Sequence, residues 1–447
     1  MVEGQFVEAV AGVRGVLEKD PENLSALRDL SRGLLNLGRL DEAAQAAATA
    51  SALAPWSAQA LQVEADIEYR RGQDERALEL IDVSLEIDAL FLQARLDRIR
   101  YLAALNREEE AIEEIEPLLE ESPDEPLVVI RFVEVVEFPA GNFRAAEERL
   151  RSALSRDPYL VEGWLLLAKV LTSEGRQTDA VAVYREALGH QGESSDLQNR
   201  LALLLADLAD PTADLALGEA IRSSPVVRAD LHVALGERLA ARGRGEEARR
   251  QFEIAANAPT FSAATRNSKG MAMLHLGRVA EAEATWREVI RDDPDFGRAW
   301  LNLSSLSIQR RNWSEVERCA RIAVEKERYS APAWNNLAIG LEELGRKAEA
   351  EAAYRKASEV DPRDYRALFN LGILLRKSTR FDEAAAVQRE VLTRNPAHAG
   401  AHFELGMLYA GPLADLQRAK IHLQAVIGAD PNHPRARQAR TVLDRLP

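Results

Sequence analysis

Apolar residues recur along the chain with the spacing of amphipathic helices, and residues 331–364 show the pattern most clearly. A first stripe falls at i, i+3, i+4 and i+7, so its members share one face of a helix: Trp334, Leu337, Ala338 and Leu341. A second stripe begins after Gly345, a residue type that commonly ends a helix, and it consists of Ala350, Tyr354 and Ala357. Pro362 stops the second helix, because proline cannot continue a helix. These residues predict two short antiparallel helices.

The same unit repeats along the whole chain with a period near 34 residues. Pro21 and Pro55 are 34 residues apart, and Pro123 follows 68 residues later, which is twice that period. A period of this length indicates an array of helix pairs. The spacing predicts twelve full repeats, which start near residues 24, 58, 92, 126, 161, 195, 228, 263, 297, 331, 365 and 399.

The order of residues within a unit resembles the tetratricopeptide repeat (TPR): Trp, then Leu with Gly or Ala, then Gly, Ala, an aromatic residue, Ala and Pro. The eighth position is small in four repeats, which hold Gly270, Ala338, Gly372 and Gly406. The twentieth position is alanine in ten repeats: Ala43, Ala77, Ala111, Ala146, Ala180, Ala248, Ala282, Ala350, Ala384 and Ala419. The resemblance covers essentially the whole chain. It implies an all-α fold, a right-handed TPR superhelix (α-solenoid) of about twelve helix–turn–helix repeats with an extra helix at each end.

Several repeats depart from the pattern. Repeat three carries Arg95 and Arg98 where apolar packing is usual, and repeat four has one extra residue around 137–142. Repeat six is degenerate and one residue short, and repeat nine has Val316 instead of alanine at the twentieth position. We expect these departures to shift local helix boundaries and to leave the architecture unchanged.

The two ends suggest a division into three parts. Residues 1–23 match only a second helix, which is either a natural cap or the remainder of a preceding repeat. Residues 24–433 form the array. Residues 434–447 read as a C-terminal capping helix that packs Val442 and Leu443 against the last repeat.

Composition narrows the class of protein further. The net charge of −15 argues against a nucleic-acid or anionic-membrane surface, because both need a basic face. Cys319 is the only cysteine, which excludes an intrachain disulfide and fits a reducing compartment. Residues 1–20 lack the basic start and apolar core of a signal peptide, and no apolar run reaches the ~20 residues that cross a bilayer. Only eight lysines accompany the many arginines, which suggests a bacterial source. We expect a cytoplasmic protein, or a periplasmic one if a leader is missing.

No catalytic or nucleotide-binding motif occurs, so we expect no enzyme activity and no cofactor. His398 and His402 are four residues apart, a spacing that suits zinc. His402, however, takes the first packing position, where other repeats have tryptophan, so we expect packing and no metal. The acidic run 107–126 is either a solvated outer face or a docking patch for a basic partner.

Asparagine occupies the sixth position of three consecutive repeats, at Asn302, Asn336 and Asn370. The resemblance implies that this position lines the concave groove of the superhelix, as in the asparagine ladder of O-GlcNAc transferase TPR arrays. An asparagine amide offers both donors and acceptors to the backbone of an extended peptide. We expect further groove residues nearby: Met271, Arg298, Ser305, Asn335, Ile339, Arg366, Phe369, Ile373, Phe403 and Met407. The lysines of the carboxylate clamp found in chaperone-binding TPR proteins are missing.

These observations favour a non-enzymatic scaffold that binds a protein or peptide in its concave groove. Two alternatives stay open. The array could recruit substrates for a larger enzyme, such as a glycosyltransferase or a sulfatase-like protein, or it could assemble with further copies of itself as a homo-oligomer.

Overall fold

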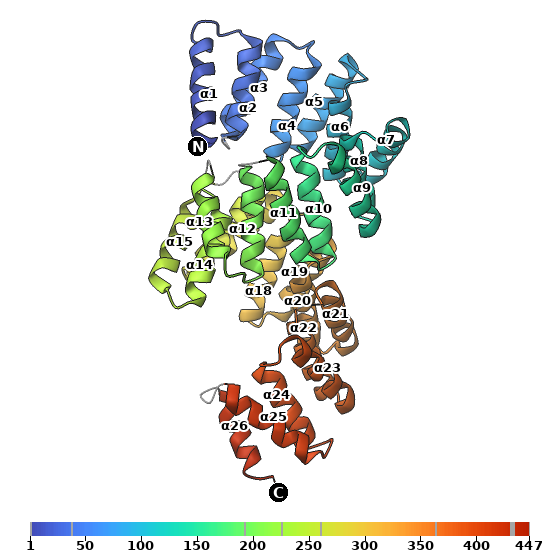
Figure 1. Cartoon of the computed structure of the whole chain (residues 1–447), viewed down its shortest axis with the longest axis vertical. Coiled ribbons are helices and arrows are strands. Elements are labelled where there is room, and N and C mark those ends of the chain that lie inside the picture. Colours follow the sequence, from blue (N-terminus) through green and yellow to red (C-terminus); the bar gives the residue numbers. More distant parts are fainter. Residues whose placement is uncertain are drawn as a thin grey trace. The chain divides into compact units, whose positions relative to one another are not determined.

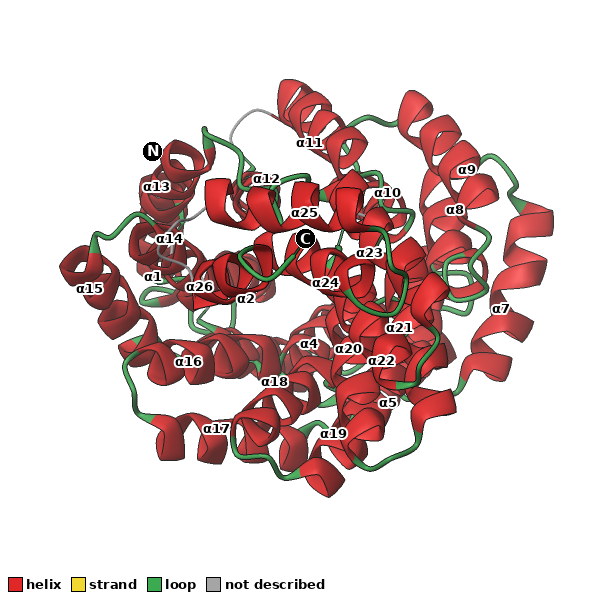
Figure 2. Ribbon diagram, turned by 90° about the horizontal axis from the view of Figure 1, so that it is seen from below, coloured by secondary structure: helices red, strands yellow, loops and turns green. Residues whose placement is uncertain are grey.

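The computed structural model describes residues 2–36, 39–191, 194–224, 227–259, 262–362, 364–429 and 434–446. Two compact units divide the chain, Met1–Thr285 and Trp286–Pro447. Helices α1 to α16 belong to the first unit and α18 to α26 to the second, and α17 (Val279–Asp292) contains the boundary. Figure 2 shows that helices and connecting loops make up the described chain, with no strand among the described residues.

The helices of the first unit alternate in direction and each packs on the next (Figure 1). Their bounds are α1 (Val2–Leu17), α2 (Leu24–Asn36), α3 (Leu40–Leu53), α4 (Ala58–Arg70), α5 (Asp74–Ile87), α6 (Leu92–Ala104), α7 (Glu108–Glu121), α8 (Pro126–Phe132), α9 (Phe143–Arg156), α10 (Val161–Ser173), α11 (Gln177–Gln191), α12 (Ser195–Asp207), α13 (Ala213–Ser223), α14 (Ala229–Ala241), α15 (Gly245–Asn257) and α16 (Ala263–His275).

The second unit continues the same alternation. Its helices are α18 (Gly297–Gln309), α19 (Trp313–Lys326), α20 (Ala331–Glu343), α21 (Lys347–Val360), α22 (Arg366–Lys377), α23 (Phe381–Arg394), α24 (Ala399–Ala410), α25 (Leu416–Ala429) and α26 (Pro434–Leu443). The first helix of every repeat begins within one residue of the start that the proline spacing predicts. The all-α prediction of helix pairs, with an extra helix at each end, is therefore confirmed.

Small residues at fixed positions bring the helices of a repeat together. All ten alanines of the twentieth position are buried. At the eighth position, a Cβ added to Gly406 would lie 2.7 Å from the Cγ of Leu423 on the facing second helix. Real Cβ atoms do not approach so closely, so the pair packs at a distance that only a small residue permits.

Repeat nine has valine instead of alanine at the twentieth position, and a glycine on the next helix leaves space for it. Val316 is fully buried on α19. Its Cγ1 lies 2.9 Å from the place where a Cβ of Gly340 on α20 would be. The missing side chain of the next first helix makes room for the larger valine, so the departure is compensated across the repeat boundary.

The extra residue of repeat four lies inside a helix. Immediately after α8, residues Val133–Glu137 form a π-helical segment, and the amide of Phe138 donates to the carbonyl of Val133 at 2.8 Å. A π-turn is the form in which an α-helix accommodates one inserted residue. The insertion therefore lies earlier than the sequence suggests, within the helix and before the turn at 138–142.

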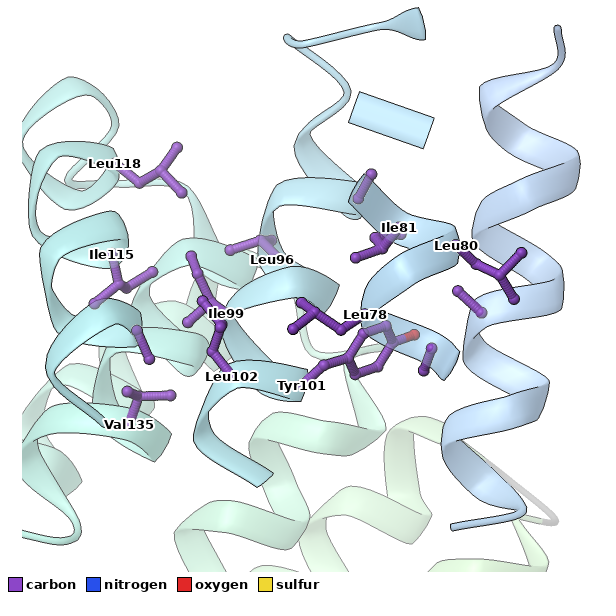
Figure 3. Close-up of a cluster of buried hydrophobic side chains, with 14 of the residues drawn as sticks. Leu78, Leu80, Ile81, Leu96, Ile99, Tyr101, Leu102, Ile115, Leu118 and Val135 are labelled. Atoms are coloured by element: carbon purple, nitrogen blue, oxygen red, sulfur yellow. The ribbon is translucent and has the colours of Figure 1, made fainter. Parts of the chain in front are cut away.

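Arginines of repeat three form ion pairs where other repeats have apolar contacts. The Nε of Arg98 lies 2.6 Å from Asp82, and its guanidinium also contacts Glu114. Arg95 lies 3.6 Å from Glu121. The apolar core is continuous through this repeat, and Figure 3 shows the cluster that joins α5, α6 and α7: Leu78, Leu80, Ile81, Leu96, Ile99, Tyr101, Leu102, Ile115 and Leu118.

Candidate peptide-binding face

First helices of the second unit leave one row of side chains only partly covered. In α18, α20, α22 and α24 the seventh, eighth and eleventh positions are buried, whereas the second, fifth and ninth positions are half-buried or exposed. We call this second set the first-helix face. Its members are Arg298, Leu301, Ser305, Pro332, Asn335, Ile339, Arg366, Phe369, Ile373, Gly400, Phe403 and Met407.

The sixth position faces the neighbouring first helix. Asn336 is 8% exposed, and its Nδ2 donates to the hydroxyls of Ser304 at 2.9 Å and Ser305 at 2.8 Å on α18. The bonds of Asn336 thus join two repeats. This corrects the expectation that the side chain stands open in the groove, because the two serines already occupy its donor.

The other asparagines differ in exposure. Asn302 is half-buried on α18. Asn370 is half-buried on α22, and its Nδ2 donates to the Oδ1 of Asn335 on α20 at 3.1 Å. Asn335 and Asn370 therefore form a pair of amides between two first helices, at the border of the first-helix face.

Apolar side chains fill the centre of the first-helix face. Ile339, Ile373 and Met407 hold the ninth position of three consecutive first helices, and Phe369 and Phe403 hold the fifth. Arg435 of α26 lies over both aromatic rings, at 5.6 Å and 5.5 Å from their centroids. These five predicted residues therefore occupy partly exposed positions of the first-helix face, and Arg435 of α26 covers part of its aromatic end.

Arginines stand at the second position of two first helices. The side chain of Arg298 is mostly exposed and lies 3.8 Å from Glu327. That of Arg366 is equally open and pairs with Asp364 at 2.6 Å. Met271 is half-buried on α16, which belongs to the first unit and not to the unit that carries the first-helix face.

Histidines of the last repeat serve as packing and capping groups. The Nε2 of His402 donates to the carbonyl of Pro396 at 2.9 Å, as the indole of Trp334 does to Arg328, six residues before it. When the ring of His402 is neutral, its Nδ1 accepts, and the Nδ1 of His422, 3.0 Å away, donates to it.

His398 begins α24 as its N-cap, and its Nδ1 accepts the amide of Ala401 at 3.0 Å. Burial lowers the pKa of His398, and the positive charges of Arg435 and His402 lower it further. The neutral ring suits this cap, because a protonated Nδ1 has no lone pair to offer. Among the described residues, no three histidine, cysteine or acidic side chains are placed to hold a metal ion.

A second polar network lies in the first unit and was not among the predicted features. Asp97 is fully buried on α6 and accepts from Gln62 at 2.7 Å, Gln93 at 3.1 Å and Arg100 at 2.5 Å. Arg100 also reaches Asp66 at 3.3 Å. Burial raises the pKa of Asp97, and the positive charge of Arg100 opposes that shift.

This network borders a hollow of about 280 Å³, which is lined by Arg32, Leu35, Gln62, Val63, Asp66 and Gln93. The sequence does contain a sign of this polar network. Asp97 holds the sixth position of repeat three, and Arg131 holds the sixth position of repeat four. Asparagine is therefore only one of several polar residue types that mark this position.

Comparison with known proteins bears on the family and the fold. A family model described as the tetratricopeptide repeat matches residues 28–90, 137–197, 233–295, 267–315, 335–399 and 374–434, together more than half of the chain. A search of curated proteins found no match to this chain. No described helix has the length and apolar character that a membrane span needs.

One solved structure shares the architecture at low sequence identity, and two others are similar more remotely. The crystal structure of the APC/C hetero-tetramer Cut9–Hcn1 has a TM-score of 0.63 and is 16% identical, covering 100% of this chain and 94% of that chain. The yeast Tom70 structure has a TM-score of 0.41 and is 17% identical, covering 99% of this chain and 92% of that chain. The structure of YrrB, "a TPR protein with an unusual peptide-binding site", has a TM-score of 0.35 and is 20% identical, covering 40% of this chain and 92% of that chain. The repeat pattern, the helix pairs and the matched family model together place this chain in the tetratricopeptide repeat family.

Proposed function

We propose that the protein is a non-enzymatic scaffold that binds an extended peptide along the first-helix face of repeats nine to twelve. The observation that carries this proposal is the row of partly exposed apolar side chains on consecutive first helices, with Ile339, Ile373 and Met407 in one line. Apolar side chains of a bound peptide would cover this row. Each Å² of apolar surface removed from water would contribute about 25 cal/mol to the free energy of binding.

Polar groups along the same face favour an extended backbone with acidic flanks. The amide of Asn335 on this face, and those of Asn302 and Asn370 at the adjoining sixth position, can exchange hydrogen bonds with peptide groups of any sequence. The guanidinium groups of Arg298 and Arg366 are mostly exposed, and beside their ion pairs with Glu327 and Asp364 they keep N–H donors that can reach a carboxylate of a ligand. We therefore propose a ligand that combines apolar anchors with acidic residues.

A random dodecapeptide library displayed on phage provides the test, because the partner is not needed in advance. Selected peptides are synthesised and titrated by calorimetry against the wild-type chain, Met407→Glu and Ile373→Glu. We expect each variant to weaken binding at least tenfold. Circular dichroism reports whether the variants keep their helices.

Ile421→Glu is the matched control, since Ile421 is exposed on α25 of the same unit and lies outside the first-helix face. Selected peptides that bind both face variants as tightly as the control would refute this assignment, as would a selection that enriches no peptide.

A further inference from the structure

A row of exposed apolar side chains follows one edge of the first unit. In a series of antiparallel helices, every second turn lies on the same edge. The turns α1–α2, α3–α4 and α5–α6 therefore share an edge, and Figure 1 shows them at the upper ends of these helices. Six large apolar residues at this edge are between 41% and 83% exposed: Val16, Leu24, Trp56, Val83, Ile87 and Leu90. We call these six residues the apolar edge.

The turns themselves do not need these side chains. In the α3–α4 turn, the hydroxyl of Ser57 accepts the amide of Ala60 and caps α4. In the α5–α6 turn, the carboxylate of Asp88 accepts the amide of Leu90 at 3.1 Å. Polar neighbours thus supply the turn chemistry, while Trp56 and Leu90 present 71% and 83% of their surface to solvent. Turn positions favour small polar residues, so the formation of the turns does not account for these large apolar side chains.

Their arrangement is that of an interaction surface. Single exposed apolar residues are common on proteins, but contiguous rows mark binding sites. Val83 and Ile87 lie one helical turn apart at the end of α5, Leu90 follows in the adjoining turn, and Trp56 lies in the corresponding turn of the preceding repeat. Tryptophan is among the residues that dominate the energy of protein interfaces.

Charge around the apolar edge indicates the character of the partner. The exposed charged residues of these turns are five acids and one base: Glu18, Asp20, Glu22, Glu86, Asp88 and Lys19. An acidic surround attracts a basic partner and disfavours a second copy of the same edge.

Spacing indicates the form of that partner. First helices of neighbouring repeats contact one another along this unit, so successive turns are about 10 Å apart. Seven residues of an α-helix rise about 10.5 Å. Apolar residues seven apart on one helix would therefore meet successive turns. We propose that the apolar edge docks a basic amphipathic helix of a partner protein, independently of the first-helix face.

A designed probe tests this proposal. The probe is a fluorescein-labelled 18-residue helical peptide with leucines seven residues apart and lysines and alanines between them. Anisotropy titrations compare the wild-type chain with the double variant Trp56→Gln/Leu90→Gln. We expect at least tenfold weaker binding by the double variant, with unchanged circular dichroism because both side chains are largely solvated.

Three controls test whether the probe binds at the apolar edge and whether its binding depends on the acidic residues around that edge. Leu215→Gln removes an exposed leucine elsewhere in the same unit, on α13, and should bind as the wild type does. Ile373→Glu should also leave binding unchanged, which distinguishes this surface from the first-helix face. A probe with glutamates in place of lysines should bind at least tenfold more weakly.

Any of three results would overturn the assignment. The first is a double variant that binds the probe as tightly as the wild type, and the second is a wild type that does not bind it. The third is a concentration-dependent dimer in sedimentation that Trp56→Gln/Leu90→Gln abolishes, because the occupant would then be a second copy of this chain.

Discussion

At the residue scale, the sixth position of the first helix is a polar link between neighbouring repeats in part of the array, although Val63, Leu166 and Val233 make it apolar in other repeats. Its polar members include Asp97, Arg131, Asn336, Asn370 and Glu404, and Glu404 accepts from Arg376 of the preceding first helix at 2.8 Å. Asparagine and aspartate are poor interior helix formers because their side chains compete for backbone hydrogen bonds. Their presence here is explained by partners about 30 residues away. Sequence periodicity could locate this position but could not reveal that Ser304 and Ser305 receive the amide of Asn336.

Replacing Asn336 by alanine should therefore destabilise the protein. The change removes one hydrogen bond from the buried hydroxyl of Ser304 and one from the half-buried hydroxyl of Ser305, although both hydroxyls keep their bonds to the carbonyl of Leu301. Each lost bond costs about 0.5–1.5 kcal/mol. The better helix propensity of alanine returns at most ~0.7 kcal/mol. Urea unfolding followed by circular dichroism should show a lower midpoint for Asn336→Ala. Asn302→Ala should lower the midpoint less, because water can replace a half-buried amide; equal midpoints for both variants would show that the serine bonds contribute nothing extra.

At the scale of the helical element, caps and crossings decide where helices begin and how closely they pack. The helix starts could be predicted because proline, glycine and the alanine register are local signals. The π-turn at Val133–Glu137 and the fit of Val316 against Gly340 could not, since both depend on how neighbouring helices meet. The C-terminal repeat adds a further contact between elements, the histidine pair that joins α24 to α25.

This pair makes the last repeat sensitive to acid. Burial lowers the pKa of His422 from 6.5 to about 4, helped by the positive charges of His402 and Arg418. Between these two values the unfolded chain binds more protons than the folded one, so stability is lost as pH falls through that window. Hydrogen exchange should show faster opening of α24 to α26 at pH 5 than at pH 7, after correction for intrinsic rates. His422→Gln should reduce that difference; an undiminished pH response would place the titrating group elsewhere.

At the scale of the whole molecule, each repeat packs mainly on its neighbours, so stability is approximately a sum of local terms. The family and the solenoid architecture could be predicted because the same signals recur about every 34 residues and reinforce one another. The candidate site could be predicted only in part. The repeat register marks Ile339, Ile373 and Phe369 as candidates for one face, and their binding role stays a prediction, whereas the bonds of Asn336, the Asp97 network and the apolar edge each depend on distances between repeats.

A local perturbation should accordingly stay local. Ala350 is fully buried where α20 and α21 cross, and Ala350→Leu would overpack that crossing at a cost of about 1–3 kcal/mol. Hydrogen exchange should accelerate in repeats nine to eleven and remain unchanged in α2 to α7. Uniform acceleration along the chain would contradict nearest-neighbour coupling.

The π-turn of repeat four also has a consequence for how such a gene can change. One additional codon is accommodated inside a packed helix, and the following repeats keep their own phase, because α10 begins at Val161 and α18 at Gly297 with the usual helix pairs. Insertions in this lineage therefore need not be confined to loops. A frame-preserving insertion in a first helix can persist as a bulge, from which ancestry could be traced among proteins whose sequences have otherwise diverged.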